Sequence, residues 1–192
     1  GHDRLASDTS RPIQLLSNAS EKCNATLLTP DPGEESHLCA GRLTPSAYPF
    51  EVRTIRYHLG HGASQSVECN AGLEHKVELY VSSGVKPPAS PTSPLTLTVP
   101  AMDPKSITSE GREVSLDLAS PLTLATGEHL FIAIRFAGTH PNVLCVGVNE
   151  EDPYQSDRNY WSNAAAAPYP WVQLDSFGLK GSIMVSALGY FK

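Results

Sequence analysis

The residues best suited to chemistry lie in one acidic stretch, residues 149–161. It reads Asn-Glu-Glu-Asp-Pro-Tyr-Gln-Ser-Asp-Arg-Asn-Tyr-Trp, with three consecutive acids followed by Asp157. Carboxylate oxygens are hard ligands of the kind that calcium prefers. The spacing fits no EF-hand loop, and an acidic loop exposed to water explains the same residues. The sequence therefore predicts no cofactor, and calcium is the cation to test.

Aromatic residues gather in the same region. Five of the fourteen aromatic residues, including both tryptophans, fall between Tyr154 and Trp171. One explanation is structural, with large rings packing a hairpin onto a sheet. The other is a recognition surface, where rings stack on sugars and polar neighbours bond to the hydroxyl groups. The candidate ligand-binding residues are Tyr154, Asp157, Arg158, Asn159, Tyr160, Trp161 and Trp171.

One pair of histidines is close in the sequence, His58 and His61. With His75 as a third ligand on a facing strand, they would suit a transition metal. Strand alternation predicts a different position for His58. Its neighbours Tyr57 and Leu59 would face the core, so His58 would lie on the polar outer face. We predict the outward position and no metal ligand.

Motifs of nucleophilic catalysis are missing. The chain has no G-x-S-x-G elbow, no S-x-x-K with its partner motifs and no H-E-x-x-H helix. Carboxylates gathered from distant strands, as in glycosidases, would leave no local motif, so a secreted hydrolase stays as an alternative. The sequence favours a non-catalytic protein.

Four cysteines occur without a CxxC pair, which disfavours zinc ribbons and redox motifs. An even number in a turn-rich chain indicates two disulfides and an oxidising compartment. We predict the bridges Cys23–Cys39 and Cys69–Cys145, although four cysteines permit three pairings and the sequence cannot choose among them. The alternative is four buried thiols in a cytosolic protein.

Charge and hydropathy limit the partners and the compartment. The net charge is −6 without a run of lysine or arginine, which disfavours nucleic acid. No stretch approaches the roughly 20 apolar residues of a membrane helix. The start at Gly1-His2-Asp3 is typical of a chain whose leader has been removed, so we expect a secreted, periplasmic or outer-surface protein. Asn18-Ala19-Ser20 and Asn24-Ala25-Thr26 match the glycosylation pattern.

Alternation between apolar and polar residues predicts an all-β protein. Residues 76–81, 95–99 and 113–118 each have one apolar face, as antiparallel strands with one buried face do. Residues 130–136 and 143–148 are apolar almost throughout and predict central strands. Residues 182–188 predict the last strand. The 16 prolines and a charged content of 18% indicate many turns rather than disorder.

One predicted strand changes phase. In residues 50–59 the apolar positions are even up to Val52 and odd from Ile55. One inserted residue near Arg53 and Thr54 would restore the phase, which is the effect of a β-bulge. Two short strands joined by a bend are the alternative.

The first 47 residues have little periodicity, and only residues 13–16 resemble a strand. We predict an N-terminal extension over residues 1–47, pinned by the Cys23–Cys39 bridge, and a β-sandwich domain over residues 48–192. Eight to ten strands without helices indicate a two-sheet antiparallel sandwich with jelly-roll or related Greek-key connections.

Three segments carry a resemblance to a known group of proteins. They are Tyr48-Pro49-Phe50 before the bulged strand, residues 121–130, and Trp171-Val172-Gln173-Leu174 with residues 177–181. Together they resemble secreted bacterial β-sandwich modules of surface proteins and lipoproteins, over about residues 48–189. The resemblance implies an exported sandwich and no catalytic residue.

We therefore expect a non-catalytic binding or adhesion module that recognises a glycan or a protein at the cell surface. A structural accessory domain without a small ligand and a secreted hydrolase are the alternatives.

Overall fold

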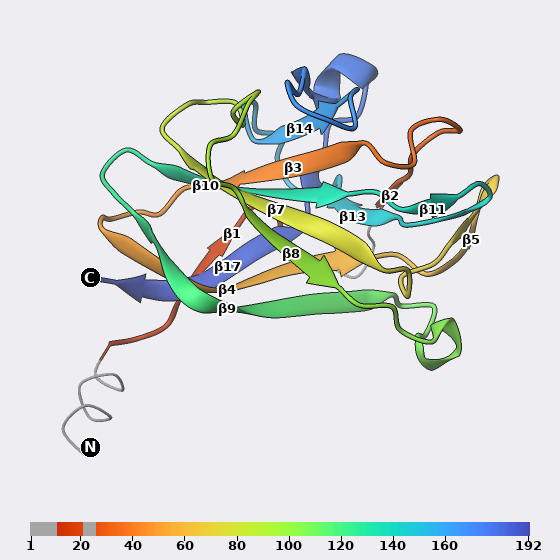
Figure 1. The fold of residues 1–192 in the computed structure, drawn as a ribbon, viewed down its shortest axis with the longest axis horizontal. Coiled ribbons are helices and arrows are strands. Elements are labelled where there is room, and N and C mark those ends of the chain that lie inside the picture. The colour runs from red at the N-terminus through yellow and green to blue at the C-terminus, as the bar shows by residue number, and fades with distance from the viewer. Residues whose placement is uncertain (1–10, 21–25) are drawn as a thin grey trace.

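The computed structural model describes residues 11–20 and 26–192, and nearly all of its regular structure is β (Figure 1). Two larger sheets face each other, with β3, β10 and β7 in one layer and β4, β17 and β9 in the other. In the described residues, no helix is long and apolar enough to cross a membrane.

The seven-stranded sheet has the order β1-β17-β4-β13-β16, with β2 beside β13 and β9 beside β4. Its strands are β1 (Gln14–Ser17), β2 (Thr26–Leu28), β4 (Phe50–Leu59), β9 (Arg112–Leu124), β13 (Val146–Asn149), β16 (Ser182–Ile183) and β17 (Val185–Phe191).

The six-stranded sheet has the order β15-β14-β3-β10-β7-β8. Its strands are β3 (Leu38–Leu43), β7 (His75–Ser82), β8 (Leu95–Val99), β10 (His129–Arg135), β14 (Asn159–Ser162) and β15 (Trp171–Gln173).

A small four-stranded sheet has the order β11-β12-β6-β5 and includes one parallel pair, β12 with β6. Its strands are β5 (Gly62–Ser64), β6 (Val67–Cys69), β11 (Gly138–Thr139) and β12 (Asn142–Val143). Two short 3-10 helices are η1 (Pro104–Ser106) and η2 (Leu174–Phe177).

The described residues form seventeen strands, so the prediction of eight to ten is wrong. Two causes account for the difference. Apolar runs predicted as single strands are divided, as where residues 143–148 contribute to both β12 and β13. The strands of the small sheet have two or three residues, which are too few to show alternation.

Alternation did locate the longer strands. Val77 and Leu79 on β7, Val99 on β8 and Val114 on β9 belong to the core between the two larger sheets. This main core also contains Leu130, Ile132 and Ile134 of β10 on one side and Val146 and Val148 of β13 on the other. Both layers thus bury one apolar face against the other.

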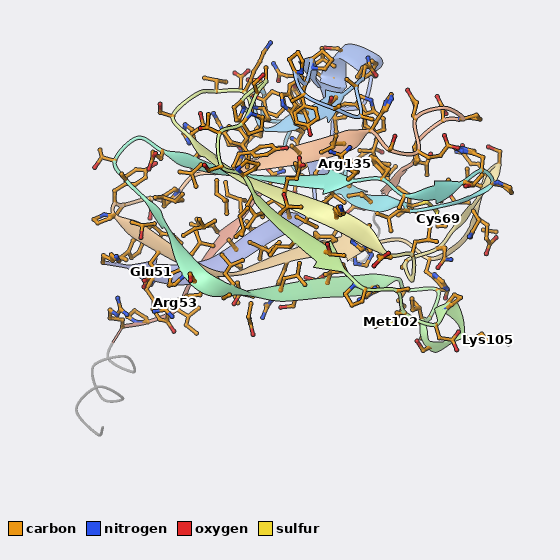
Figure 2. The ribbon with its side chains drawn as sticks, in the orientation of Figure 1. Glu51, Arg53, Cys69, Met102, Lys105 and Arg135 are labelled. Atoms are coloured by element: carbon orange, nitrogen blue, oxygen red, sulfur yellow. A yellow bond between two sulfur atoms is a disulfide. The ribbon has the colours of Figure 1, made fainter. Side chains whose placement is uncertain are left out.

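The phase change in β4 is a β-bulge. Val52 pairs with Gly189 and Thr54 pairs with the preceding residue of β17, so Arg53 is the extra residue. The bulge restores the phase, because Val52 and Ile55 are both buried in the main core. Arg53 turns outward and donates a hydrogen bond to Glu51 at 3.3 Å (Figure 2).

The described residues before position 48 contribute strands to both larger sheets. β1 pairs with β17, β2 pairs with β13, and β3 lies between β14 and β10 in the middle of the six-stranded sheet. The predicted boundary at residue 47 therefore does not separate two units. The β3 sequence Leu-Cys-Ala-Gly-Arg-Leu shows no alternation because both faces of this central strand are buried.

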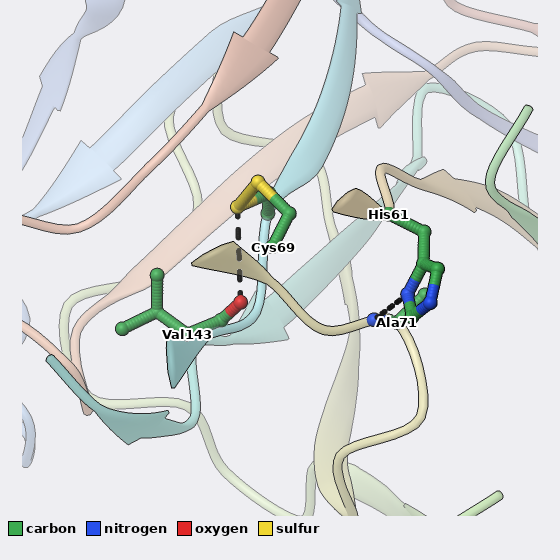
Figure 3. Close-up of a disulfide and its surroundings, with 5 residues drawn as sticks. His61, Cys69, Ala71 and Val143 are labelled. Carbon is green, nitrogen blue, oxygen red and sulfur yellow. Dashed lines mark hydrogen bonds between the residues drawn. A yellow bond between two sulfur atoms is a disulfide. The ribbon is translucent and has the colours of Figure 1, made fainter. Parts of the chain in front are cut away.

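One of the two predicted disulfides is formed. Cys69 on β6 is bonded to Cys145, with Cα atoms 5.5 Å apart, and the closed loop contributes about 4 kcal/mol in the chain-entropy model. The bonded sulfur of Cys145 lies 3.7 Å from the carbonyl oxygen of Val143 (Figure 3).

The predicted Cys23–Cys39 bridge is wrong. Cys39 is a free thiol with its side chain fully buried in the main core, where burial raises the pKa of the thiol above its usual value. Cys23 lies outside the described residues. The inward position of Cys39 follows from its place on β3, since its neighbours Leu38 and Ala40 face the opposite side of the sheet.

Candidate ligand-binding site

Most rings of the aromatic stretch form a second core on the outer face of the six-stranded sheet. Its members are Leu38, Ala40, Tyr80, Phe131, Ala133, Tyr160, Tyr169 and Trp171. Tyr160 donates its hydroxyl to the carbonyl of Val85 at 2.7 Å, and the Trp171 indole donates to the carbonyl of Pro88 at 3.1 Å. The segment that contains Val85 and Pro88 therefore covers this face, and neither ring offers a face to a ligand.

Trp161 points to the opposite side and belongs to the main core. Its ring packs against Phe136 with centroids 5.0 Å apart, and its indole nitrogen donates to Asn163 Oδ1 at 3.0 Å. Tyr160, Trp161 and Trp171 are all 5% exposed or less. Of the two explanations for the clustering of aromatic residues, the structural one accounts for these three rings.

Tyr154 is the predicted ring that remains open to a ligand, with 40% of its surface exposed. Its hydroxyl donates to the carboxylate of Asp175, and this hydrogen bond raises the pKa of Tyr154 to about 12. The ammonium of Lys180 lies 5.8 Å from the ring centroid. Tyr154 lies in the loop before β14, between two residues that line a pocket.

This pocket has a volume of about 570 Å³ and is named here the Asn18 pocket. It lies where β1 and β16 of one large sheet end beside the loop that leads into β14 of the other. Its lining residues are Leu15, Ser17, Asn18, Ala19, Ser20, Asp152, Pro153, Gln155, Arg158 and Ser182.

The amide of Asn18 is held in one orientation. Its nitrogen donates two hydrogen bonds, to Asn159 Oδ1 at 2.7 Å and to the carbonyl of Ile183 at 2.9 Å. Asn159 Oδ1 also accepts from the backbone N–H of Ile183 at 2.8 Å. The predicted site residue Asn159 therefore positions Asn18 rather than contacting a ligand itself.

The amide oxygen of Asn18 has no hydrogen-bond partner, although the residue is only 5% exposed. An unsatisfied buried acceptor costs about 1–3 kcal/mol, and most buried acceptors in proteins are paired. Asn18 lines the pocket, and its amide oxygen is one of four buried side-chain polar atoms of the described residues that lack a hydrogen-bond partner.

The acidic run holds the loop that carries Asn18. Asp152 accepts hydrogen bonds from the backbone N–H of Ser20 at 2.8 Å and from its hydroxyl at 2.6 Å. Glu150 accepts from the hydroxyl of Thr26 at 3.0 Å, and the Asn149 amide donates to the carbonyl of Ser20 at 3.1 Å. These residues thus fasten Ser20 and Thr26 to the end of β13.

Asp157 has a different structural role. Its backbone N–H donates to Gln173 Oε1 at 2.6 Å, and its carboxylate accepts from Gln173 Nε2 at 3.0 Å. This reciprocal pair fixes the turn at Asp157, whose φ of 62° lies in the left-handed region. Within residues 11–20 and 26–192, no three or more His, Cys, Asp or Glu side chains are placed to hold a metal ion.

The predicted residue Arg158 lines the Asn18 pocket. Its guanidinium donates to Gln155 Oε1, and Gln155 also lines the pocket. Burial lowers the pKa of Arg158, and the nearby charge of Arg42 lowers it further. The pocket therefore combines a cation, an unpaired amide oxygen and the serine side chains of its wall.

The three histidines do not face one another. His58 points at Glu113, with Nδ1 3.8 Å from the carboxylate, as the outward prediction requires. His61 Nδ1 accepts a hydrogen bond from the backbone N–H of Ala71 at 3.1 Å (Figure 3). His75 Nε2 lies 2.6 Å from the hydroxyl of Tyr57 in the protein interior.

Sequence reasoning missed the role of Asn18, which it identified only as a glycosylation pattern. Both N–H groups of the Asn18 amide are engaged inside the protein, so this nitrogen is not accessible for glycosylation in the folded chain. Asn24 lies outside the described residues. No local signal marks Asn18, because its partners are 141 and 165 residues away in the sequence.

Two solved structures share this fold. One is a clostridial cysteine protease, Cwp84, after propeptide cleavage, with a TM-score of 0.63 and 7% identity over 94% of this chain and 40% of that chain. The other comprises the cysteine protease and lectin-like domains of Cwp84, a surface layer associated protein of Clostridium difficile. It has a TM-score of 0.56 and 9% identity over 82% of this chain and 33% of that chain.

This chain thus spans less than half of the length of either structure, and identities this low show a similar fold and nothing more. No protein-family model and no curated protein matches the sequence.

Proposed function

We propose that this chain is a non-catalytic binding module of an exported or cell-surface protein and that the Asn18 pocket binds a glycan. The observation that carries the proposal is a pocket of about 570 Å³ that is lined by polar side chains, among them Asn18, whose amide is fixed by its neighbours and whose oxygen is buried without a partner. This volume lies within the range of small-molecule sites in proteins.

The lining of the pocket suits a sugar. Sugar hydroxyl groups both donate and accept hydrogen bonds, and the wall contains side chains of both kinds, among them Ser20, Gln155 and Arg158. Leu15 is 52% exposed and gives the wall an apolar part on which the C–H face of a sugar can rest. Tyr154 lies in the chain between the lining residues Pro153 and Gln155, and its ring is exposed.

Binding without cleavage fits the carboxylates of the pocket. Glycosidases use two carboxyl groups, one on each side of the scissile bond. Among the described lining residues, Asp152 is the single carboxylate, and both of its oxygens accept hydrogen bonds from Ser20. The proposal therefore favours a binding module over the hydrolase alternative.

Two further observations support the proposal. The solved structures with the same fold come from a surface-layer associated protein, and one of them includes a lectin-like domain. The Cys69–Cys145 disulfide is compatible with an oxidising, extracellular compartment. We also propose jelly-roll-type connections between the two larger sheets, as in many lectin domains.

A glycan array followed by calorimetry with the best ligand tests the proposal. Leu15→Ala removes most of the apolar wall and Gln155→Ala removes a polar group. Each is expected to weaken binding about tenfold, which corresponds to about 1.4 kcal/mol.

Ile13→Ala is the matched control, because Ile13 is 61% exposed two residues before Leu15 and does not line the pocket. It should leave binding unchanged. The absence of any glycan ligand, or equal effects of Leu15→Ala and Ile13→Ala, would contradict the proposal.

A further inference from the structure

Two arginines lie directly opposite each other on neighbouring strands. β14 runs antiparallel to β3, and Asn159 pairs with Gly41. The same register places Arg158 opposite Arg42, and the backbone N–H of Arg42 donates to the carbonyl of Arg158 at 2.9 Å. Side chains at opposite positions share one face of the sheet, about 5 Å apart at Cβ.

Position along the strands identifies this face as the outer one. Tyr160 is two residues after Arg158 and Ala40 is two residues before Arg42, and both belong to the second core on the outer face. Side chains two residues apart on a strand point to the same side. Both arginines therefore lie at the border of the second core, and the charge of Arg42 lowers the pKa of Arg158.

Within residues 11–20 and 26–192, no ion pair includes either arginine. The ion pairs there are formed by Arg11, Arg53, Arg135, His58 and His140. Arg158 donates to an uncharged amide, Gln155, and Arg42 Nε is buried without a partner. His129 lies on the same face of the sheet, but a histidine carries no negative charge. Burial and the charge of Arg42 lower its pKa.

Two carboxylates near this group are engaged elsewhere. Glu128 accepts a hydrogen bond from the backbone N–H of Ala125 at 2.7 Å, and Asp157 accepts from Gln173. Like charges opposite each other destabilise a sheet. The chain has 20 acidic and 14 basic residues, so it contains more acidic residues than its basic residues could pair with. An arginine pair that takes part in no ion pair is free to bind an anion from outside the protein.

We propose that Arg42 and Arg158 bind an oxyanion group, a carboxylate, sulfate or phosphate, carried by the ligand of the Asn18 pocket. This inference rests on the proposed function and adds to it that the glycan is acidic. Arg158 lines the pocket and lies opposite Arg42 on the neighbouring strand, so a ligand that contacts Arg158 has the second guanidinium close to it. Guanidinium groups suit oxyanions because their planar N–H groups match two oxygens at once.

The test compares acidic oligosaccharides with their neutral counterparts by calorimetry. Uronic-acid oligosaccharides are paired with their carboxyl-reduced forms, and sulfated or phosphorylated ones with desulfated or dephosphorylated forms. The acidic member of one pair should bind at least tenfold more tightly, since hydrogen bonds to charged groups are stronger than those between neutral groups. Arg42→Gln and Arg158→Gln should each abolish this preference.

A second readout uses inorganic sulfate and does not depend on a glycan. Sulfate should raise the melting temperature of the native protein and leave that of Arg42→Gln unchanged. In sulfate-free buffer Arg42→Gln should melt above the native protein, because the like-charge repulsion is gone. Arg56→Gln is the control, since Arg56 lies in the middle of β4 between Ser115 and Ser186 and should behave like the native protein.

The outcomes separate this inference from the proposed function. Equal binding of neutral and acidic glycans would overturn the inference and leave the glycan function standing. A sulfate effect lost in Arg42→Gln, without any glycan ligand, would support the anion site and overturn the glycan function. Equal responses of the native protein and Arg42→Gln to sulfate would show an adventitious ion only and overturn the inference.

Discussion

The outer faces of the two larger sheets differ in how they are covered. On the seven-stranded sheet, Thr54 and Arg56 of β4 face Asp117 and Ser115 of β9 through side-chain hydrogen bonds of 2.9 and 3.3 Å. On the six-stranded sheet, the outer face carries the second core, which is covered by loop segments. One face is polar and partly open to solvent, and the other is a buried aromatic layer.

This difference between the two faces explains why aromatic residues cluster in the sequence. Large rings near the C-terminus are needed to cover a second apolar face, since a sheet with two apolar faces must bury both. The groups of the proposed ligand site are not part of this layer and belong to the Asn18 pocket and the arginine pair. Four predictions test how different the two faces are.

The largest expected effect is on the covered face. Trp171→Ala should lower the free energy of unfolding by about 3–5 kcal/mol, because Trp171 packs against Tyr80 and Tyr169 and is 4% exposed. Urea denaturation measures the change. Tyr154→Ala is the control and should change the free energy by less than about 0.5 kcal/mol, as exposed substitutions do. Equal effects of both substitutions would remove the distinction between a structural and an exposed ring.

The next effect concerns the main core that both sheets share. Ile55→Ala should cost about 2–5 kcal/mol, since Ile55 is fully buried just after the bulge in β4. Denaturation in urea again gives the value. A loss below about 0.5 kcal/mol would show that the inward face of β4 is not the one that contains Ile55.

The pH dependence of stability should come from the interior rather than from the open face. Burial lowers the pKa of His75 below its usual 6.5, and the charge of Arg112 adds to the effect, while the carbonyl of Leu73 opposes it. The unfolded chain then binds a proton at a higher pH than the folded one does. The free energy of unfolding is therefore highest above pH 6.5 and falls as the pH drops below it.

Thermal unfolding between pH 7.5 and 5 measures this decrease. His75→Gln should reduce the slope, and the remainder should include a contribution from His129, whose pKa is also lowered. A slope that is unchanged in His75→Gln would show that His75 does not contribute.

The smallest effect is expected on the polar face. Ser115→Ala removes a hydrogen bond of 3.3 Å from Arg56 to an exposed hydroxyl and should change the free energy of unfolding by less than about 0.5 kcal/mol. Thermal denaturation against the native protein is sufficient. A loss above about 1.5 kcal/mol would mean that this face also depends on tightly packed contacts.

The sequence by itself determined the strands that have one apolar and one polar face. The alternation of β7, β8 and β9 and the phase change at Arg53 follow from residues that are neighbours in the chain, so a local pattern contains them. The Cys69–Cys145 pairing agreed with the prediction, but the sequence permitted two other pairings. Cys39 was misassigned because burial on both faces of β3 leaves no periodicity that distinguishes a core thiol from a bridged one.

Only the tertiary structure decided which polar residues meet. Asn18 acquires its fixed orientation from Asn159 and Ile183, and Arg42 meets Arg158 through the register of β3 and β14. Such contacts join residues more than 100 positions apart, and no local spacing encodes them. The tertiary structure also decided the exposure of the Tyr160 and Trp171 rings, because the segment around Val85 and Pro88 folds over them.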